Sequence, residues 1–161
     1  MARDLQVTGL DEFGQLLQEA GDHAMGIAKG ALFEGAAVVA DAMRASLDQI
    51  KTEPFRWATE DDKRYPSPEE KAAVLTARYG VAKFRGTGAE VDTIVGIAGS
   101  GYRHLMGKDV PTAEILRAIQ SGTSFMKAQP VVRKALRAAL GPANAKIIAA
   151  ANERFQTIFG K

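Results

Sequence analysis

The residues of this chain that could do chemistry are few and scattered. The only two histidines, His23 and His104, lie far apart, and neither has a carboxylate at the spacing of a zinc motif. No serine stands in the Gly-x-Ser-x-Gly context of a nucleophile elbow. The chain has no cysteine, which removes disulfides and thiolate metal sites. The sequence therefore predicts a protein that is not an enzyme and that has no cofactor or metal site.

Two glycine-rich turns come nearest to a nucleotide site. Gly86-Thr87-Gly88 and Gly99-Ser100-Gly101 lack both the Lys-Ser/Thr of a P-loop and the full dinucleotide-binding spacing. The first of them joins two expected strands, which favours a hairpin turn. The acidic run Glu60-Asp61-Asp62 lacks the alternating oxygen ligands and glycine of a calcium loop. We expect that run to be part of a solvated loop.

A basic cluster is the charged feature that could meet a partner. Arg133, Lys134 and Arg137 have helical spacing, and Lys127 comes shortly before them. Two interpretations stay open, a solvated helix face or a surface that meets nucleic acid or an acidic partner. No aromatic residues alternate with these charges, so stacking on a single strand is not indicated. With 21 Lys and Arg against 19 Asp and Glu, the net charge of +2 does not indicate a general nucleic-acid coat.

The spacing of apolar residues predicts an unusually long helix in the N-terminal third. After a short strand expected at residues 3–7, apolar residues recur every three or four positions from Leu10 to Ile50. A helix of ~40 residues is roughly 60 Å long. Glycines inside it each cost ~1 kcal/mol relative to alanine, which leaves two explanations open. The helix breaks near Gly21 or Gly30, or its small residues allow a neighbour to approach closely.

The middle of the chain predicts a loop, a short helix and a hairpin. Residues 53–68 are polar and charged and are expected to form a surface loop. Ser67, followed by proline and two acids, is a helix start, and the helix is expected to run to about Tyr79. Strands at 81–85 and 90–97 are expected to pair as a hairpin. Residues 102–109 are expected to be loop.

The C-terminal part predicts further helices. Pro111 opens a short helix whose Ile115, Leu116 and Ile119 are expected to face inward. A helix over residues 131–140 is expected to end at Gly141-Pro142. A final helix then runs to about Phe159, and its expected apolar side consists of Ile147, Ile148, Ala151, Phe155 and Ile158.

Residues 121–130 predict a rigid corner between helices. Gly122 can adopt a positive φ that stops the preceding helix, and Thr123 and Ser124 can bond freed backbone groups. Pro130 forces the residue before it out of the helical region and starts the next helix. The residues we expect to form the corner and an interface are Gln120, Gly122, Thr123, Ser124, Met126, Ala128, Gln129 and Pro130.

These elements together predict a single α+β domain over residues 1–161. Its parts are a long N-terminal helix, a small antiparallel sheet with a hairpin, and C-terminal helices. No apolar run reaches the ~18 residues that would span a bilayer. The first four residues include Asp4 and lead into no apolar segment, so a secretory signal is not expected.

In this order of elements the chain resembles the tail-completion or neck proteins of long-tailed bacteriophages, also described as minor tail components. Residues 5–12, 31–41 and 119–136 carry the resemblance. The third segment is the most specific, since the family has Glu-aromatic-Gly-Thr-Ser followed by Pro-Phe and a helix. This chain departs from that pattern at Gln120, Ser121 and Val131. The resemblance covers most of the chain except residues 56–79, which look like an insertion.

The resemblance implies a non-enzymatic virion protein, made in the host cytoplasm. It implies a homo-oligomeric ring, a hexamer, that completes the tail end and joins it to the head, with DNA passing through the lumen. The implied partners are other copies and neighbouring neck and tail proteins, such as the stopper or connector, the tail terminator and the tail tube. Lys127, Arg133, Lys134 and Arg137 would then face DNA or an acidic partner.

Other functions also stay open. A tail terminator or a head-side adaptor ring would use similar elements. A small helical DNA-binding domain would use the basic cluster, and a small hydrolase with a dispersed site has no support in the sequence. No membrane partner is expected.

Overall fold

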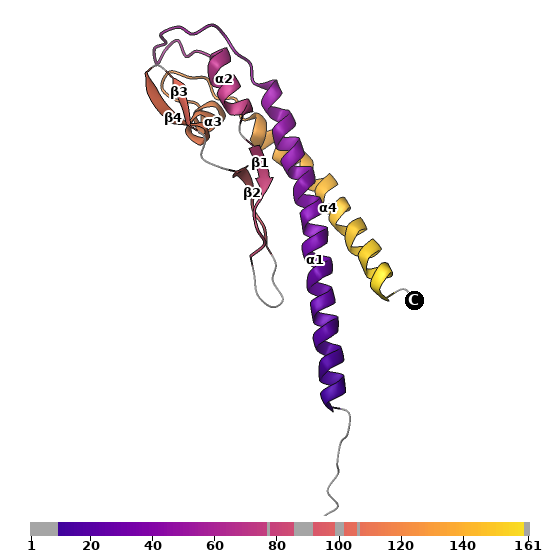
Figure 1. The fold of residues 1–161 in the computed structure, drawn as a ribbon. Coiled ribbons are helices and arrows are strands. Elements are labelled where there is room, and N and C mark those ends of the chain that lie inside the picture. Colours follow the sequence, from indigo (N-terminus) through magenta and orange to yellow (C-terminus); the bar gives the residue numbers. More distant parts are fainter. Residues whose placement is uncertain (1–9, 77, 86–91, 99–101, 106, 160–161) are drawn as a thin grey trace, which may run out of the picture.

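The computed structural model describes residues 10–76, 78–85, 92–98, 102–105 and 107–159. Two long helices lie side by side, and a group of short elements packs around one end of the pair (Figure 1). Helix α1 spans Leu10–Ser46 and continues into a short 3-10 helix, η1, at Leu47–Gln49. Helix α4 spans Val131–Phe159. The predicted α+β class is confirmed, and the strand expected at residues 3–7 lies outside the described residues.

Helix α1 is continuous, so the alternative of a break near Gly21 or Gly30 is wrong. Close approach of a neighbour explains two of its glycines. A Cβ at Gly35 would meet the Ile147 side chain and would lie 3.1 Å from the Ala143 carbonyl oxygen, and a Cβ at Gly30 would meet the Arg154 side chain. Because glycine has no side chain, α4 can lie close against α1 at these two points.

Helix α4 runs antiparallel to α1. Gly30 lies beside Arg154 and Gly35 lies beside Ala143, so residue numbers increase along α1 in the direction in which they decrease along α4. Val39 packs against Ala139 and Ala143 between the helices. The N-terminal part of α1 extends beyond the C-terminal end of α4 (Figure 1).

The expected end of a helix at Gly141-Pro142 is wrong, because α4 passes through both residues. Proline inside a helix removes one hydrogen bond and costs ~3 kcal/mol. Packing against α1 offsets that cost, since Ala139 and Ala143 on either side of Pro142 are buried there. The Pro142 ring itself is exposed, as is Ala138, whose carbonyl loses its helical partner.

The expected apolar side of this last helix is also wrong in part. Ile148, Phe155 and Ile158 are exposed, by 62%, 57% and 38%. Small residues face the interior instead, with Ala150 almost fully buried. Alanines form much of the α4 side of this close contact, and Ile147 fits there against Gly35, whereas Ile148, Phe155 and Ile158 turn outward.

Six short elements build the other end of the molecule. In chain order they are α2 (Pro68–Leu75), β1 (Arg78–Val81), β2 (Val95–Ala98), β3 (Tyr102–Leu105), β4 (Lys108–Pro111) and α3 (Thr112–Ser121). Two antiparallel pairs, β1–β2 and β3–β4, form among the described strands.

Two expectations about these elements are corrected. Helix α2 ends at Leu75 rather than near Tyr79, because residues 78–81 pair with β2 and place Tyr79 in the core. The loop expected at 102–109 contains β3 and the start of β4. Gly107 between these strands has a φ of 78°, which a tight turn requires and glycine adopts without strain.

The predicted hairpin exists, with strands displaced outward from the expected bounds. The pairing of β1 with β2 continues to a hydrogen bond from Ala82 N to Ile94 O, and Arg85 and Asp92 then exchange two backbone bonds. Residues 83 and 84 therefore stand opposite Thr93 alone, which is a β-bulge. The Thr93 hydroxyl donates to the Ala82 carbonyl at this point. The predicted turn at 86–88 lies outside the described residues.

The main core lies where η1, α2, α3 and the start of α4 meet. Its buried members include the three α3 residues that the sequence placed inward, Ile115, Leu116 and Ile119. Ala73 and Val74 of α2 are fully buried in the same cluster. Residues 56–79 thus contribute to the core, and whether they are an insertion relative to a family stays a prediction.

Candidate interaction surface

The corner at residues 121–130 has the predicted form. Gly122 follows α3 with φ 75° and ψ 170°, a region that is essentially restricted to glycine, and its N–H donates to the Ala118 carbonyl. A Cβ at Gly122 would lie 3.0 Å from the Met126 carbonyl oxygen. Thr123 N donates to that same oxygen, so the chain turns back on itself within five residues.

Side chains of the corner bond back to the protein that holds it. The Thr123 hydroxyl accepts from Phe125 N and Met126 N. Gln120 Oε1 accepts from Val132 N, at 3.1 Å, in the first turn of α4. The Gln129 side chain accepts from Lys51 N and donates to Lys51 O, both at 2.9 Å. The corner is therefore fixed at both of its helices and to the chain that leaves η1.

Arg64 ties the loop before α2 to the corner. Its N–H donates to Phe125 O, and its carbonyl accepts from Lys127 N. Its guanidinium donates to both carboxylate oxygens of Glu70, at 2.6 and 2.7 Å, and Glu70 also accepts from Ser67 N to complete a capping box for α2. Arg64 is 8% exposed, so this ion pair lies inside the protein.

The pKa values at this ion pair follow from its contacts. Burial on its own would raise the pKa of Glu70, but the bonds from Arg64 and Ser67 outweigh it and lower that pKa. Hydrogen bonding to Glu70 raises the pKa of Arg64. Both groups therefore carry full charge near neutral pH, and the bidentate pair holds the loop and α2 in one position.

The predicted corner residues divide into two groups. Met126 and Gln129 are buried, and Gln120, Gly122 and Pro130 are half-buried. These residues hold the angle between α3 and α4. Thr123, Ser124 and Ala128 are exposed at the outside of the corner, where a neighbouring molecule could reach them.

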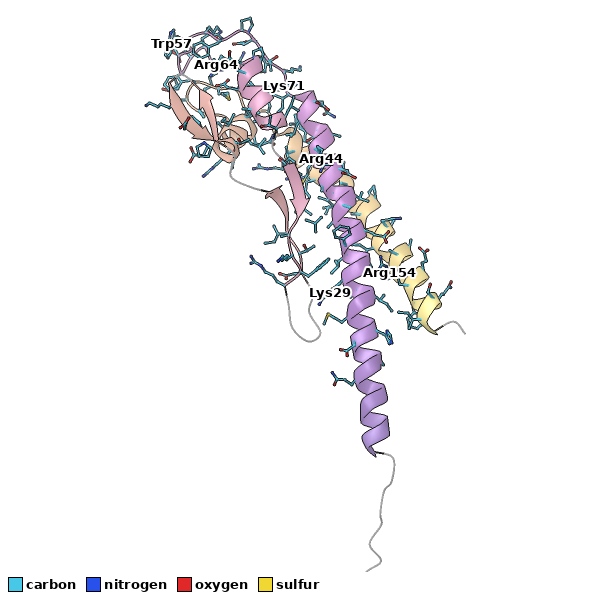
Figure 2. All side chains as sticks on the ribbon, in the orientation of Figure 1. Lys29, Arg44, Trp57, Arg64, Lys71 and Arg154 are labelled. Carbon is cyan, nitrogen blue, oxygen red and sulfur yellow. The ribbon has the colours of Figure 1, made fainter. Side chains whose placement is uncertain are left out.

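Three exposed aromatic side chains gather beside the corner. We call them the aromatic surface, and they are Phe55, Trp57 and Phe125, with exposed fractions of 44%, 83% and 56%. The Phe55 and Trp57 rings meet edge to face at 5.5 Å, and the Arg64 guanidinium lies 5.0 Å from the Phe55 ring centroid. Figure 2 shows Trp57 and Arg64 at the end of the molecule away from the projecting part of α1.

A shallow cavity of about 210 Å³ opens within the aromatic surface. The described residues that line it are Phe55, Arg56, Trp57, Ala58, Arg64 and Phe125. Arg56 is held by Glu53 and Asp62, so its charge is already paired. The cavity is thus largely apolar and suits an apolar side chain of a partner.

The aromatic surface was not predicted from the sequence. One signal was available, because Trp57 is the only tryptophan of the chain and stands in a polar segment. The position of Phe125 beside Phe55 was not visible in the sequence, because it depends on Arg64, whose N–H donates to Phe125 O and whose guanidinium lies near the Phe55 ring.

The predicted basic cluster lies at the surface. Lys127, Arg133, Lys134 and Arg137 are all exposed, and Lys127 Nζ lies 4.7 Å from the Tyr65 ring centroid. Within the described residues, Arg133, Lys134 and Arg137 have no carboxylate partner. In contrast, Lys146 and Arg154 both pair with Glu34 of α1, and these bonds lower the pKa of that carboxyl.

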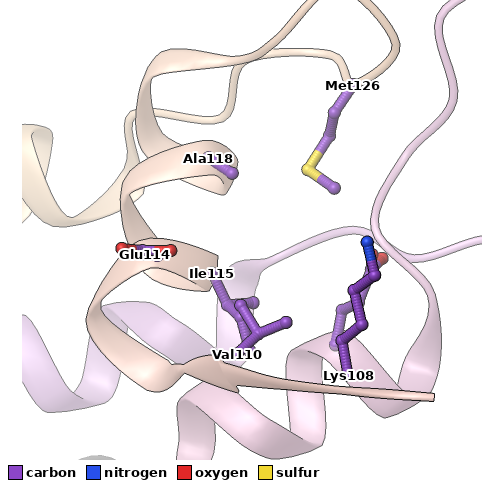
Figure 3. A pocket seen from close by; sticks show the side chains of 7 residues that line it. Lys108, Val110, Glu114, Ile115, Ala118 and Met126 are labelled. Carbon is purple, nitrogen blue, oxygen red and sulfur yellow. The ribbon is translucent and has the colours of Figure 1, made fainter. Parts of the chain in front are cut away.

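A second, larger cavity of about 510 Å³ lies between α3, β4 and the corner. Lys108 rises from β4 near Val110, with Met126 across the cavity and Ala118 on the α3 side (Figure 3). Glu70 at this cavity is already bonded to Arg64. The other charged residues that line it are Lys108 and Glu114, and the rest of the described lining is apolar, with Val110, Ile115, Ala118 and Met126.

The described part of the chain shows no arrangement that would bind a metal ion, since no group of three or more His, Asp or Glu residues comes together there. None of the described helices is long and apolar enough to cross a membrane. Comparisons with protein-family models, curated proteins and solved structures found no match to this chain.

Proposed function

We propose that this protein is a structural subunit of the neck of a long-tailed bacteriophage. In this proposal, identical copies form a ring, a hexamer, at the head–tail junction. The ring completes the tail end, contacts other neck and tail proteins, and lets DNA pass through its lumen. The sequence resemblance at residues 119–136 supplies the phage context, and the surfaces of the fold support an assembly role.

The aromatic surface is the observation that carries the assembly role. Large exposed aromatic groups on a soluble chain mark contact sites, because leaving them in water forgoes the free energy of burying them. Tryptophan and arginine are also the residues that most often dominate interface energies. The Trp57 ring contacts Phe55 edge to face at 5.5 Å, and such a contact restricts the ring before a partner binds and so lowers the entropy lost on binding.

The rigid corner supports the same proposal. A closed ring joins two different faces of each subunit at a fixed angle, so small angular errors would prevent closure. Gln120 accepts a hydrogen bond from Val132 N, Thr123 accepts one from Met126 N, and Gln129 donates one to Lys51 O, and these bonds support the angle between α3 and α4 beside the aromatic surface. The contact surface is thus attached to the best-fixed part of the subunit.

The proposal is tested in particles. Mass spectrometry of phage particles purified from cells that express this gene should detect the protein in stoichiometric amounts. Trp57→Ala should leave thermal stability within about 0.5 kcal/mol of the original, because the side chain is 83% exposed, but should prevent incorporation into particles. Glu60→Ala, an exposed change in the same loop, is the matched control. Particles that lack the original protein would contradict the proposal.

Arg133, Lys134 and Arg137, which have no carboxylate partner among the described residues, favour one alternative, a small helical DNA-binding domain. Such a domain predicts DNA binding by the free protein that weakens steeply with salt. A mobility shift at low salt that Arg133→Ala and Arg137→Ala abolish would favour it, and no shift would dismiss it. A tail-terminator or head-side adaptor role differs only in position, so labelling of the protein in intact particles separates these alternatives.

A further inference from the structure

The side of α4 turned away from the core presents an unpartnered apolar face. We call it the α4 outer face, and it consists of Leu136, Leu140 and Ile148 together with Arg133 and Arg137. The three apolar side chains are 36%, 51% and 62% exposed. Leu140 and Ile148 point away from Ala139, which is buried against α1, whereas Leu136 lies at the edge of the face, seven residues before buried Ala143. The described residues of this chain leave this face open.

Positive and negative residues are concentrated in different parts of the chain, and this separation indicates which partner could cover the α4 outer face. Residues 115–152 contain six Lys and Arg and no Asp or Glu. Residues 10–28 contain four acids, Asp11, Glu12, Glu19 and Asp22, and no Lys or Arg. A basic, apolar surface on α4 and an acidic, apolar helix segment on α1 are therefore complementary in both respects.

The acidic segment is also the part of α1 that projects beyond α4. The close contacts of α1 with α4 reach Gly30, whereas a Cβ at Gly26 or Gly21 would meet nothing within 4 Å. Ala20 and Ala24 are exposed, although they lie on the same side of α1 as Ala31, which is buried. The side of the helix that α4 covers thus continues uncovered past the end of α4 (Figure 2).

The sequence of this segment contributes little to its own stability. Helices in proteins gain most of their stability from packing of one face, and each internal glycine lowers helix stability further. A partner that covers Ala20 and Ala24 would supply the missing stabilisation.

We propose that the projecting end of α1 in one copy docks on the α4 outer face of a second copy of this chain. This inference rests on the proposed function and deepens it, since it names a contact between neighbouring subunits. The contact joins two different faces, which is the heterologous arrangement that builds rings.

The charges also disfavour like-to-like contacts, in which two projecting ends or two α4 outer faces meet. Two projecting ends side by side would bring eight acids together, four from each copy, and two α4 outer faces would oppose arginine to arginine. Like charges at close range disfavour both contacts. The mixed contact is the one in which each acidic segment meets a basic face.

The two surfaces of one copy cannot meet each other. At 1.5 Å per residue, Ala24 lies about 16 Å below Gly35, the point at which α1 meets Ala143 of α4. Asn144 directly follows Ala143, so it lies about 1.5 Å below that level on antiparallel α4. The separation of roughly 15 Å exceeds the ~7 Å that a disulfide can span between Cα atoms. A disulfide between these positions therefore reports a contact between copies.

The natural absence of cysteine makes this test direct. Ala24→Cys and Asn144→Cys are both exposed-site changes that leave the charges intact. Each full-length variant is oxidised alone and in an equimolar mixture, and the dimers are identified by mass. We expect a mixed dimer in the mixture, with a yield at least about tenfold above that of either variant alone, because like charges oppose the like-to-like contacts.

A charge exchange sharpens the result. Arg133→Glu with Arg137→Glu, added to the Asn144→Cys chain, should lower the mixed-dimer yield about tenfold. Glu19→Arg with Asp22→Arg in the Ala24→Cys chain should restore it. Circular dichroism confirms that each variant is folded.

Three outcomes would overturn the proposed contact: no mixed dimer, like-to-like dimers in excess, or failure of the charge exchange to restore the yield. If the protein is nevertheless found in purified particles, the neck function stands and only this contact is wrong. If the protein is absent from particles while the mixed dimer forms, the contact stands as self-association and the neck function fails.

Discussion

The two ends of this molecule differ in how their side chains are used. At the packed end, which comprises α2, α3, the corner and the loop before α2, Arg64, Glu70 and Gln129 lie mostly inside the protein and each makes at least two hydrogen bonds. At the projecting end, residues 10–28 of α1, Asp22 is exposed and Gly21 has no neighbouring atom within reach of a Cβ. One end fixes the shape of the subunit, and the other end is available to a partner.

The largest expected loss at the packed end comes from Gly122→Val. A β-branched residue at φ 75° is strained, and its Cβ would lie 3.0 Å from the Met126 carbonyl oxygen. We expect the free energy of unfolding to fall by about 3 kcal/mol or more and assembly to be lost. Urea denaturation measures the first and particle yield the second.

Gly107→Val is its control. Gly107 also has a positive φ, of 78°, but open space around its Cβ position, so strain alone should cost about 1–2 kcal/mol. Normal infectious particles from Gly122→Val would show that the corner is not needed.

Removing the buried cation is the next largest change. Arg64→Ala leaves Glu70 without its main partner inside the protein, and breaking a pair of this kind costs about 3 kcal/mol. Thermal denaturation should show this loss. Asp41→Ala removes one partner of an exposed pair with Arg44 and should cost less than about 0.5 kcal/mol. Equal effects of the two substitutions would mean that the pair at Arg64 does not hold the packed end together.

Gln129→Ala tests the attachment of the corner to the chain after η1. The substitution removes two hydrogen bonds to the Lys51 backbone, and we expect a loss of about 2 kcal/mol in urea denaturation. Hydrogen exchange at Lys51 should accelerate, because its N–H loses its acceptor. Ser124→Ala, an exposed change in the same corner, should leave both measurements unchanged. Unaltered exchange at Lys51 in the Gln129 variant would contradict this attachment.

Gly21→Ala, at the projecting end, should have the smallest effect and the opposite sign. Nothing lies within 4 Å of a Cβ there, so better helix propensity should raise stability by up to about 1 kcal/mol. Gly35→Ala on the same helix should lower stability, because the added Cβ meets Ile147 and Ala143. Thermal midpoints of the two variants compare them directly. A loss of stability in Gly21→Ala would show that this segment already has a partner within its own chain.

Much of the fold could be predicted because its signals are local. The cap at Ser67, the stop at Gly122 and the inward side chains of α3 depend on neighbours within one or two turns, and all three are confirmed. The passage of α4 through Pro142 could not be predicted, because the packing that offsets its cost comes from α1, about a hundred residues away in sequence.

The surfaces were harder to predict than the elements. Tyr79 lies in strand β1, and not in a helix, because β2 pairs with this segment. That pairing outweighs the helical pattern of the sequence before it. The aromatic surface exists because the corner and the loop before α2 bond to each other through Arg64. The basic cluster was visible in the sequence, but its position beside exposed leucines on α4 required the structure.

The most direct test of the neck assembly is a cryo-EM reconstruction of the head–tail junction in purified particles. We predict a closed ring of copies of this chain in which Trp57 is buried at a contact and the projecting end of α1 lies on α4 of the adjacent copy. A junction without density for this protein would contradict the neck function. A ring in which Trp57 and the projecting ends remain in solvent would contradict the assignment of these surfaces to assembly.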